Sequence, residues 1–311
     1  MTPAPLRIRP QLIVLLLVVM TCIPYVVVPN YLATGRLVVR SNPVPRPYMF
    51  PSGGRQLFPR YRLIALYGTP DSPVLGALGQ QNISASITRV KSIASQYQKL
   101  TQEHILPTFE IIATVASESP TSDGDYSYAI PLATLQAWIS AARAAGVYVV
   151  LDLQSGRASF LHQAQELQGL LIQPNVGLAL DPEWRLQPNE LPLEQIGSVS
   201  ISEVNQTSRW LAGLTLRYKL PQKAFVLHEF QLSMLPDRAK LDTSRRELAY
   251  IVQMDGQGSQ AAKLNTWHDI VMAAPVNVHF GWKNFYKMDT TLRSPSQTLS
   301  LSPQPWYISY Q

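Results

Sequence analysis

The chain has 311 residues, of which 46% are apolar and 15% charged, and its formal net charge is +6. Residues 1–70 contain eight of the 26 basic residues and none of the 20 acidic ones, so the rest of the chain is close to neutral. A near-neutral body gives no sign of the basic face that nucleic-acid binding requires, and we expect no nucleic-acid partner.

An apolar run covers residues 12–28 and follows a short N-terminus with two arginines. Its length is at the lower limit for a membrane-spanning helix and just above that of a signal-peptide core. We therefore interpret residues 1–28 as a signal peptide or a membrane anchor, and expect an exported protein held at the membrane or cell surface. The single cysteine excludes an intramolecular disulfide and says nothing firm about the compartment.

Residues 29–60 are predicted to form a linker, because five prolines lie between positions 43 and 59 and prevent regular structure. The arginines of this arm have two interpretations. They set the orientation of the chain in the membrane and keep it soluble, or they bind anionic lipid head groups next to a bilayer.

From residue 61 onward, short β-rich apolar runs alternate with helical patterns. The strands are expected at 62–67, 110–117, 147–154, 176–183, 224–230, 248–255, 276–282 and 306–310, and the helices at 84–101, 132–145, 158–171, 197–215, 238–246 and 259–272. Residues 283–305 are expected to be a long loop. Eight strands in about 250 residues favour a (β/α)8 TIM-type barrel over 61–311. An open doubly wound sheet is the alternative.

The fourth predicted strand ends in two carboxylates. Its sequence is Val-Gly-Leu-Ala-Leu-Asp-Pro-Glu-Trp over residues 176–184. Alternation along a strand would place Asp181 and Glu183 on one face together with the small residues Gly177 and Ala179. In a barrel that face is the interior, and the carboxyl ends of the strands form the active-site mouth.

Most of the other predicted strands also end in polar or aromatic residues. We assign catalytic roles to Glu183, Asp181, Asp152 and Asp255, because converging buried carboxylates are costly unless they are paired or functional. The candidate substrate-binding residues are Tyr67, Glu118, Gln154, Trp184, His228, Glu229, Gln253, His279 and Trp282.

Structural explanations compete with several of these assignments. Glu118 would also suit a solvated loop, and Asp152 would also suit a helix cap. The register of the fifth strand leaves open whether His228 or Glu229 faces the interior.

Other kinds of active site fit the sequence less well. The five histidines are scattered without H-x-H or H-E-x-x-H spacing, and no G-x-S-x-G motif occurs. The Gly256-Gln257-Gly258 segment lacks the third glycine and the first-strand position of a dinucleotide site. We therefore expect no cofactor and no bound metal.

The segment from Gly177 to Trp184 resembles the fourth-strand signature G-x-D-x-D-x-E-[YW] of chitinase-like (family 18) glycoside hydrolases. An Asp-x-Glu at a strand end is also similar to family 25 muramidases. The family 18 resemblance implies that Glu183 is the general acid and that Asp181 orients the acetamido group of the substrate. Ala179 stands where the family has the first aspartate of its pair.

The sequence thus predicts an exported, membrane-tethered glycoside hydrolase whose substrate is a cell-envelope or amino-sugar polysaccharide. Two alternatives remain. The departure at Ala179 would suit a non-catalytic barrel that binds a glycan or an envelope partner. A metal-assisted hydrolase would use Asp152, Asp181, Glu183 and a histidine. Retention or inversion at the anomeric carbon and the oligomeric state stay open.

Overall fold

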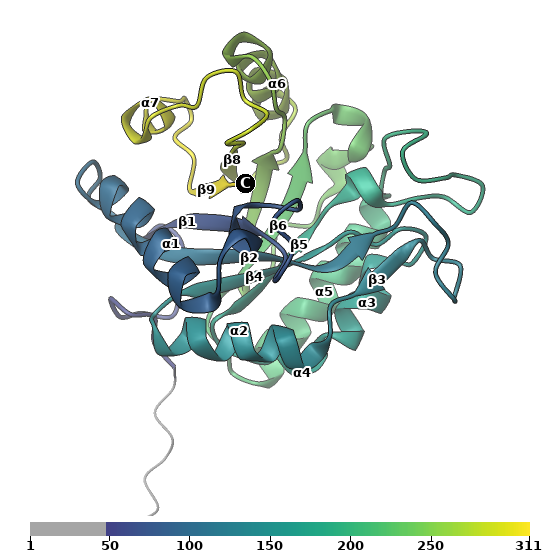
Figure 1. The fold of residues 1–311 in the computed structure, drawn as a ribbon, viewed down its shortest axis with the longest axis horizontal. Coiled ribbons are helices and arrows are strands. Elements are labelled where there is room, and N and C mark those ends of the chain that lie inside the picture. The colour runs from purple at the N-terminus through teal and green to yellow at the C-terminus, as the bar shows by residue number, and fades with distance from the viewer. Residues whose placement is uncertain (1–47) are drawn as a thin grey trace, which may run out of the picture. The chain divides into compact units, whose positions relative to one another are not determined.

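The structure is a computed structural model that describes residues 48–311, and it contains a closed barrel of eight parallel strands (Figure 1). In barrel order these are β1 (Tyr61–Gly68), β2 (His104–Ala116), β4 (Tyr148–Leu153), β5 (Val176–Leu180), β6 (Lys223–Glu229), β7 (Leu248–Met254), β8 (His279–Asn284) and β9 (Tyr307–Tyr310). The last strand pairs with the first. The closed parallel sheet and its surrounding helices make a (β/α)8 TIM-type barrel.

Seven α-helices are present among the described residues: α1 (Ile83–Gln98), α2 (Leu132–Ala144), α3 (Phe160–Glu166), α4 (Gln168–Leu171), α5 (Ile201–Arg217), α6 (Gln260–Met272) and α7 (Pro295–Leu299). Short 3-10 helices are η1 (Ala77–Gln80), η2 (Pro182–Trp184), η3 (Leu232–Met234) and η4 (Arg238–Lys240). Several helices begin at an N-cap side chain that accepts a backbone N–H, as Ser200 does from Glu203 and Ser259 from Ala262.

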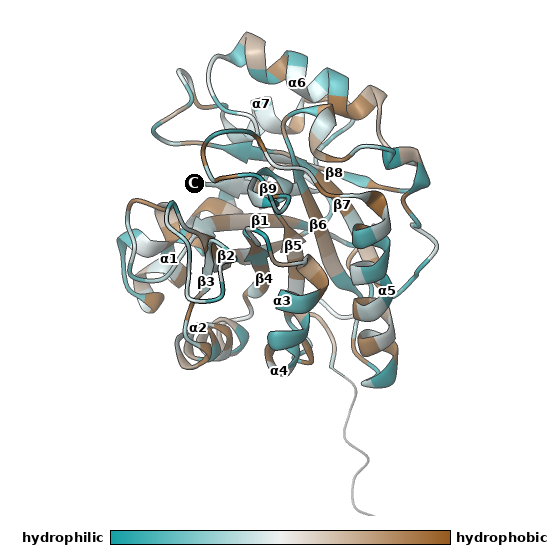
Figure 2. Cartoon of the chain, turned by 90° about the vertical axis from the view of Figure 1, so that its right-hand side faces the viewer, coloured by the Kyte–Doolittle hydropathy of each residue, from teal (hydrophilic) through white to brown (hydrophobic). Residues whose placement is uncertain are grey.

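The alternation of the strands separates two apolar layers. On β5, Leu178 and Leu180 face outward into the core between the barrel and its helices, while Ala179 faces the interior of the barrel. Figure 2 shows brown, apolar strands surrounded by helices of mixed hydropathy. Gly177 also belongs on the inner face, because a Cβ there would lie 2.9 Å from the hydroxyl of Tyr148 and 3.1 Å from Cβ of Ala224, and both side chains are in the interior.

Aromatic and aliphatic side chains close the N-terminal end of the barrel. Phe50, Leu57 and Phe58 are buried and pack against interior residues such as Leu63. The packed body therefore extends N-terminally to about Phe50, before the start of β1. This apolar plug leaves the carboxyl ends of the strands as the polar end of the interior.

The predicted segment 1–28 lies outside the described residues, as does the linker up to residue 47. Between residues 48 and 311, no helix is both long and apolar enough to cross a membrane.

Several predicted elements differ from the structure. Strand β5 ends at Leu180 rather than at residue 183, since Pro182 lacks an N–H for the ladder and instead begins η2. The helix expected at 238–246 is only η4, because Asp242 accepts the backbone N–H of Ser244 and competes with helical bonding.

The loop expected at 283–305 contains α7. A capping box between Ser294 and Gln297, with Pro295 in the first turn, starts this short helix. A short strand, β3 (Ser127–Ala129), also pairs antiparallel with β2 and was not expected.

Candidate functional site

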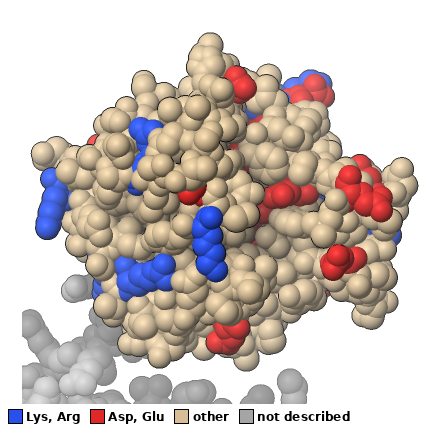
Figure 3. All heavy atoms as spheres, turned by 45° about the horizontal axis from the view of Figure 1, so that its top comes forward, with Lys and Arg blue, Asp and Glu red and all other residues tan. Residues whose placement is uncertain are grey.

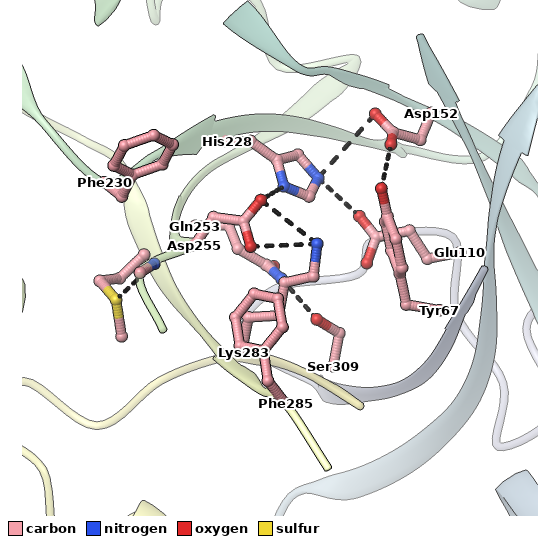
Figure 4. Close-up of polar contacts among 12 residues, drawn as sticks. Tyr67, Glu110, Asp152, His228, Phe230, Gln253, Asp255, Lys283, Phe285 and Ser309 are labelled. Carbon is pink, nitrogen blue, oxygen red and sulfur yellow. Dashed lines mark hydrogen bonds and ion pairs between the residues drawn. The ribbon is translucent and has the colours of Figure 1, made fainter. Parts of the chain in front are cut away.

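The imidazole of His228 lies at the centre of a buried polar layer inside the barrel (Figure 4). Its Nδ1 is 2.8 Å from Oδ2 of Asp255, and its Nε2 is 2.8 Å from Oε1 of Glu110. The three residues come from β6, from the end of β7 and from β2, so the barrel itself brings them together. Burial lowers the pKa of His228, but the surrounding carboxylates of Glu110, Asp152 and Asp255 raise it well above its usual value. The ring is therefore an imidazolium that donates from both nitrogens.

A second cation approaches the same carboxylate. Nζ of Lys283, from β8, lies 3.0 Å from Oδ1 of Asp255 and 3.5 Å from the centroid of the Tyr67 ring. The hydroxyl of Tyr67 in turn donates to Oδ2 of Asp152 at 2.9 Å. Asp255 thus carries one positive partner on each side, and Figure 4 shows Lys283 and His228 meeting at it.

This layer forms the floor of a cavity of about 530 Å³ at the carboxyl ends of the strands. Charged residues on the cavity wall include Asp181, Glu183, Asp255 and Lys283. Aromatic side chains also line it: Tyr67, Trp184, Phe230, Phe285 and Tyr286. A concave site with apolar walls and a few converging polar groups is typical of small-molecule and substrate sites.

The outer surface does not continue this concentration of charge. On the face shown in Figure 3, most of the surface is uncharged, and the charged side chains lie in small scattered groups rather than in one continuous patch.

Two cavity carboxyl groups have pKa values displaced in opposite directions. Burial, reinforced by the nearby charge of Asp255, raises the pKa of Glu183 to about 7. Burial would also raise the pKa of Asp255, but Lys283 and His228 outweigh it and hold that pKa below its usual value. Near neutral pH, Glu183 can therefore donate a proton while Asp255 is ionised. Such a divergence is how acid and base roles are separated in active sites.

The remaining interior aspartates are harder to ionise. Burial raises the pKa of Asp152 to about 6, with the charge of His228 acting in the opposite direction. Burial and the charge of Asp152 raise the pKa of Asp181 well above its usual value. Asp181 is only 2% exposed and lies at the end of β5, where it borders the cavity.

The structure gathers many of the residues that the sequence singled out. Glu183, Asp181 and Asp255 border the cavity together with Tyr67, Gln154 and Trp184, although Asp181 and Glu183 reach it from a turn and η2 rather than from one strand face. Asp152 and His228 lie directly beneath. Gln253 is inside the barrel, where it donates to Ser309 Oγ at 2.6 Å. It therefore belongs to the polar layer below the cavity and does not line the cavity wall.

Four candidates lie away from the cavity. Glu118 is exposed on the loop after β2. Glu229 faces outward from β6 and pairs with Arg238, which resolves the register of that strand in favour of His228. The ring of Trp282 packs 5.7 Å from that of Trp267 on α6, outside the barrel. His279 begins β8 and stacks 4.2 Å from Phe58 at the opposite end.

Two charged residues of the site were not anticipated. Glu110 was expected to be the first residue of the strand at 110–117, far from its carboxyl end, whereas β2 begins at His104 and holds Glu110 in its middle. Lys283 follows Trp282, the last residue of the predicted strand, whereas β8 continues to Asn284. The sequence did carry one signal for Lys283. It directly follows the predicted strand, and Gly281, two residues before it, faces the interior of the barrel.

A metal site would draw on Asp181, His228 and Asp255, which each offer a ligand atom within 4.8 Å of the others. The donor chemistry does not suit a metal ion. Both nitrogens of His228 donate to carboxylates, so neither has a free lone pair, and Lys283 already occupies Asp255. In the cluster, Asp255 is instead compensated by the protonated ring of His228 and the ammonium group of Lys283.

No known protein-family model matches the sequence. No curated protein matches it either. Among solved structures, the chain is similar to a xylanase and α-amylase inhibitor protein from Scadoxus multiflorus, with a TM-score of 0.45, 14% identity, and coverage of 80% of this chain and 92% of that one. It is also similar to tryptophan synthase from M. tuberculosis (TM-score 0.37, 13% identity, 81% and 82% covered). A putative aldolase domain from Bacteroides vulgatus gives a TM-score of 0.40, 10% identity, and coverage of 80% and 72%. Likenesses this distant indicate neither a ligand nor an activity.

Proposed function

We propose that this barrel is a glycoside hydrolase in which Glu183 is the general acid and Asp255 is the ionised carboxylate that acts as nucleophile or base. One observation carries the proposal: two carboxyl groups with oppositely displaced pKa values border one cavity at the catalytic end of a (β/α)8 barrel. Glycoside hydrolysis requires this pair, because one group protonates the leaving oxygen while the other attacks the anomeric carbon or activates water.

The other residues of the site support these two roles. Lys283 and His228 keep Asp255 charged, and Glu110 holds the far side of the imidazolium. Tyr67 orients Asp152 beneath the cavity. Trp184 adjoins Glu183 in η2 and offers an apolar surface of the kind on which sugar rings pack.

The substrate proposed is a polysaccharide of the cell envelope, and residues 1–28 are proposed to export the chain and tether it to the membrane. The apolar run at 12–28 supports this localisation. In intact cells that express the full-length chain, an external protease should degrade the protein. Complete protection that is lost only after the cells are lysed would contradict the export proposal.

The activity is tested by incubating the full-length protein with chitooligosaccharides, glucosamine oligosaccharides and peptidoglycan, and measuring new reducing ends. We expect hydrolysis of at least one of them, and proton NMR of the first product then shows whether its anomeric configuration is retained or inverted. Binding of a glycan without any turnover would overturn the catalytic proposal and favour the non-catalytic barrel.

A further inference from the structure

The interior of the barrel holds more buried acids than buried cations. Five carboxyl groups converge at its carboxyl end, from Glu110, Asp152, Asp181, Glu183 and Asp255, around the two cations His228 and Lys283. A buried carboxylate is stable only when a cation, a proton or several hydrogen-bond donors compensate its charge. His228 and Lys283 contact Glu110 and Asp255, which leaves the remaining acids less well compensated.

Among these less well compensated acids, Asp181 is the one that borders the cavity. It is 2% exposed, it borders the cavity, and its Oδ1 has no hydrogen-bond partner among the residues that the structure describes. Buried polar atoms are almost always hydrogen-bonded, so an unpartnered oxygen on a cavity wall is a place where a ligand donor fits.

Titratable and charged groups from several strands act on Asp181, including the hydroxyl of Tyr67 on β1. The others are Asp152 from β4, Glu183 from η2, Asp255 after β7, His228 from β6 and Lys283 from β8. The three carboxyl groups make the surroundings of Asp181 favourable for one additional positive charge.

The walls of the cavity also suit a cation. The rings of Trp184, Phe230 and Phe285 line it, and aromatic faces attract ammonium groups. The site already contains one such contact, because Nζ of Lys283 lies over the ring of Tyr67.

We propose that the cavity binds a substrate bearing an ammonium group, namely a glycan of 2-amino-2-deoxy sugars with free amines, and that Asp181 binds the amine. The inference rests on the proposed glycosidase function and specifies its substrate class. An N-acetylated sugar is neutral at nitrogen and would offer no positive charge to the carboxyl group of Asp181. A metal cation is disfavoured because the imidazolium of His228 has no free lone pair.

Proton release accompanies this binding. Burial raises the pKa of Asp181 well above its usual value, and an ammonium group beside it favours the carboxylate. Binding of the amine therefore lowers the pKa of Asp181, and we expect it to release a proton into solution. A neutral glycan in the same cavity would expel none.

Isothermal titration calorimetry on the full-length protein tests the inference with three probes: the tetramers of glucosamine, N-acetylglucosamine and β-1,4-linked glucose. At pH 6, where the amines remain largely charged, the glucosamine tetramer should bind at least tenfold more tightly than either neutral tetramer. Titrations in two buffers of different ionisation enthalpy should report proton release with the glucosamine tetramer alone.

Two variants and a metal-binding test serve as controls for the calorimetry. Asp181→Asn should reduce the preference to about that of the neutral tetramers, whereas Glu118→Gln, at an exposed acid outside the cavity, should preserve it. Equal or tighter binding of a neutral tetramer by the wild-type protein would overturn the proposal, even if Asp181→Asn failed to fold. So would Asp181-dependent binding of Mg²⁺ or Zn²⁺, which would assign the site to a metal.

The outcomes separate this inference from the proposed function. Tight binding of glucosamine tetramer without cleavage of any glycan would refute the hydrolase and leave the ammonium site standing. Cleavage of a neutral glycan with no preference for the amine would do the reverse.

Discussion

The chemistry assigned to this barrel depends on a few residues whose charges are set by their neighbours. Asp255 is ionised because Lys283 and His228 contact it, and burial near that charge raises the pKa of Glu183 to about 7, so that it can donate a proton. Several members of the group could be predicted as strand-end polar residues. Lys283 and Glu110 could not, since their importance depends on the exact register of β8 and β2.

The pH dependence of activity should change when the cation beside Asp255 is removed. Wild-type kcat/KM should fall as the pH rises through about 7, because Glu183 then loses the proton that it donates. Lys283→Met removes the cation that lowers the pKa of Asp255, so the acidic limb of the profile should move to higher pH. The exposed Lys91→Met on α1 is the control. An acidic limb at the same pH in Lys283→Met and wild type would show that Asp255 is not the ionised partner.

Stability should depend on pH through Lys223, a buried residue outside the site. Burial lowers its pKa from 10.5 to about 7, and its Nζ donates to the carbonyl oxygens of Gln173 and Val176. Between these two pH values the unfolded state binds more protons than the folded state. The free energy of unfolding therefore gains a contribution as the pH rises through this window, and loses it as the pH falls to 7.

Urea unfolding at pH 7 and pH 9.5 measures this effect. The increase in unfolding free energy should be larger for wild type than for Lys223→Met, and Lys91→Met should behave as wild type. The same increase in all three proteins would mean that Lys223 keeps its proton when folded.

At the scale of elements, one loop of the cavity is tied down by a buried ion pair. Asp289 pairs with Lys263 of α6 and accepts the backbone N–H groups of Phe285 and Gly258. Lys263 also donates to the carbonyl oxygen of Lys283 at 2.8 Å. The segment 285–288, which lines the cavity after β8, is thereby fixed to α6.

Breaking this tether should loosen the cavity wall. Asp289→Ala leaves Lys263 buried without its partner, which costs about 3–5 kcal/mol of stability for a buried pair. Substrate KM should rise because the loop is no longer held. In contrast, Asp237→Ala removes the exposed pair with Lys240 and should cost less than about 1 kcal/mol. Chemical denaturation and steady-state kinetics check both; equal losses in the two variants would contradict the role assigned to Asp289.

The elements themselves were largely predictable, and the exceptions have local causes. Apolar runs with inward-facing small residues marked the barrel strands, and helices that begin at serine caps, such as α5 and α6, followed helical patterns. The helix expected at 238–246 failed because the side chain of Asp242 bonds to the backbone of Ser244. Strand β3 spans three residues, too few for a period to be recognised.

At the scale of the whole molecule, the barrel depends on its last strand. Strand β9 pairs with both β8 and β1, and its buried residues Tyr307 and Ile308 face the interior and the outer core respectively. Alternation and strand count indicated the barrel. The closing pair could not be read from sequence, because it joins segments more than 240 positions apart.

Removal of residues 306–311 should therefore open the barrel. Without β9, the edges of β8 and β1 lose their hydrogen-bond partners and the interior of the barrel is exposed. Thermal unfolding followed by circular dichroism should show no cooperative transition for the truncated chain. A sharp transition near the wild-type midpoint would contradict the requirement for closure.

The role of Glu183 is tested most directly by comparing two leaving groups in the Glu183→Gln variant. One substrate is the glycan that the wild-type protein cleaves, and the other is the 2,4-dinitrophenyl glycoside of the same sugar, whose leaving group needs no proton. If Glu183 is the general acid, kcat/KM of the variant should fall about 10²–10⁴-fold on the glycan and stay close to wild type on the dinitrophenyl glycoside. Unchanged hydrolysis of the glycan, or an equal loss on both substrates, would contradict the assignment.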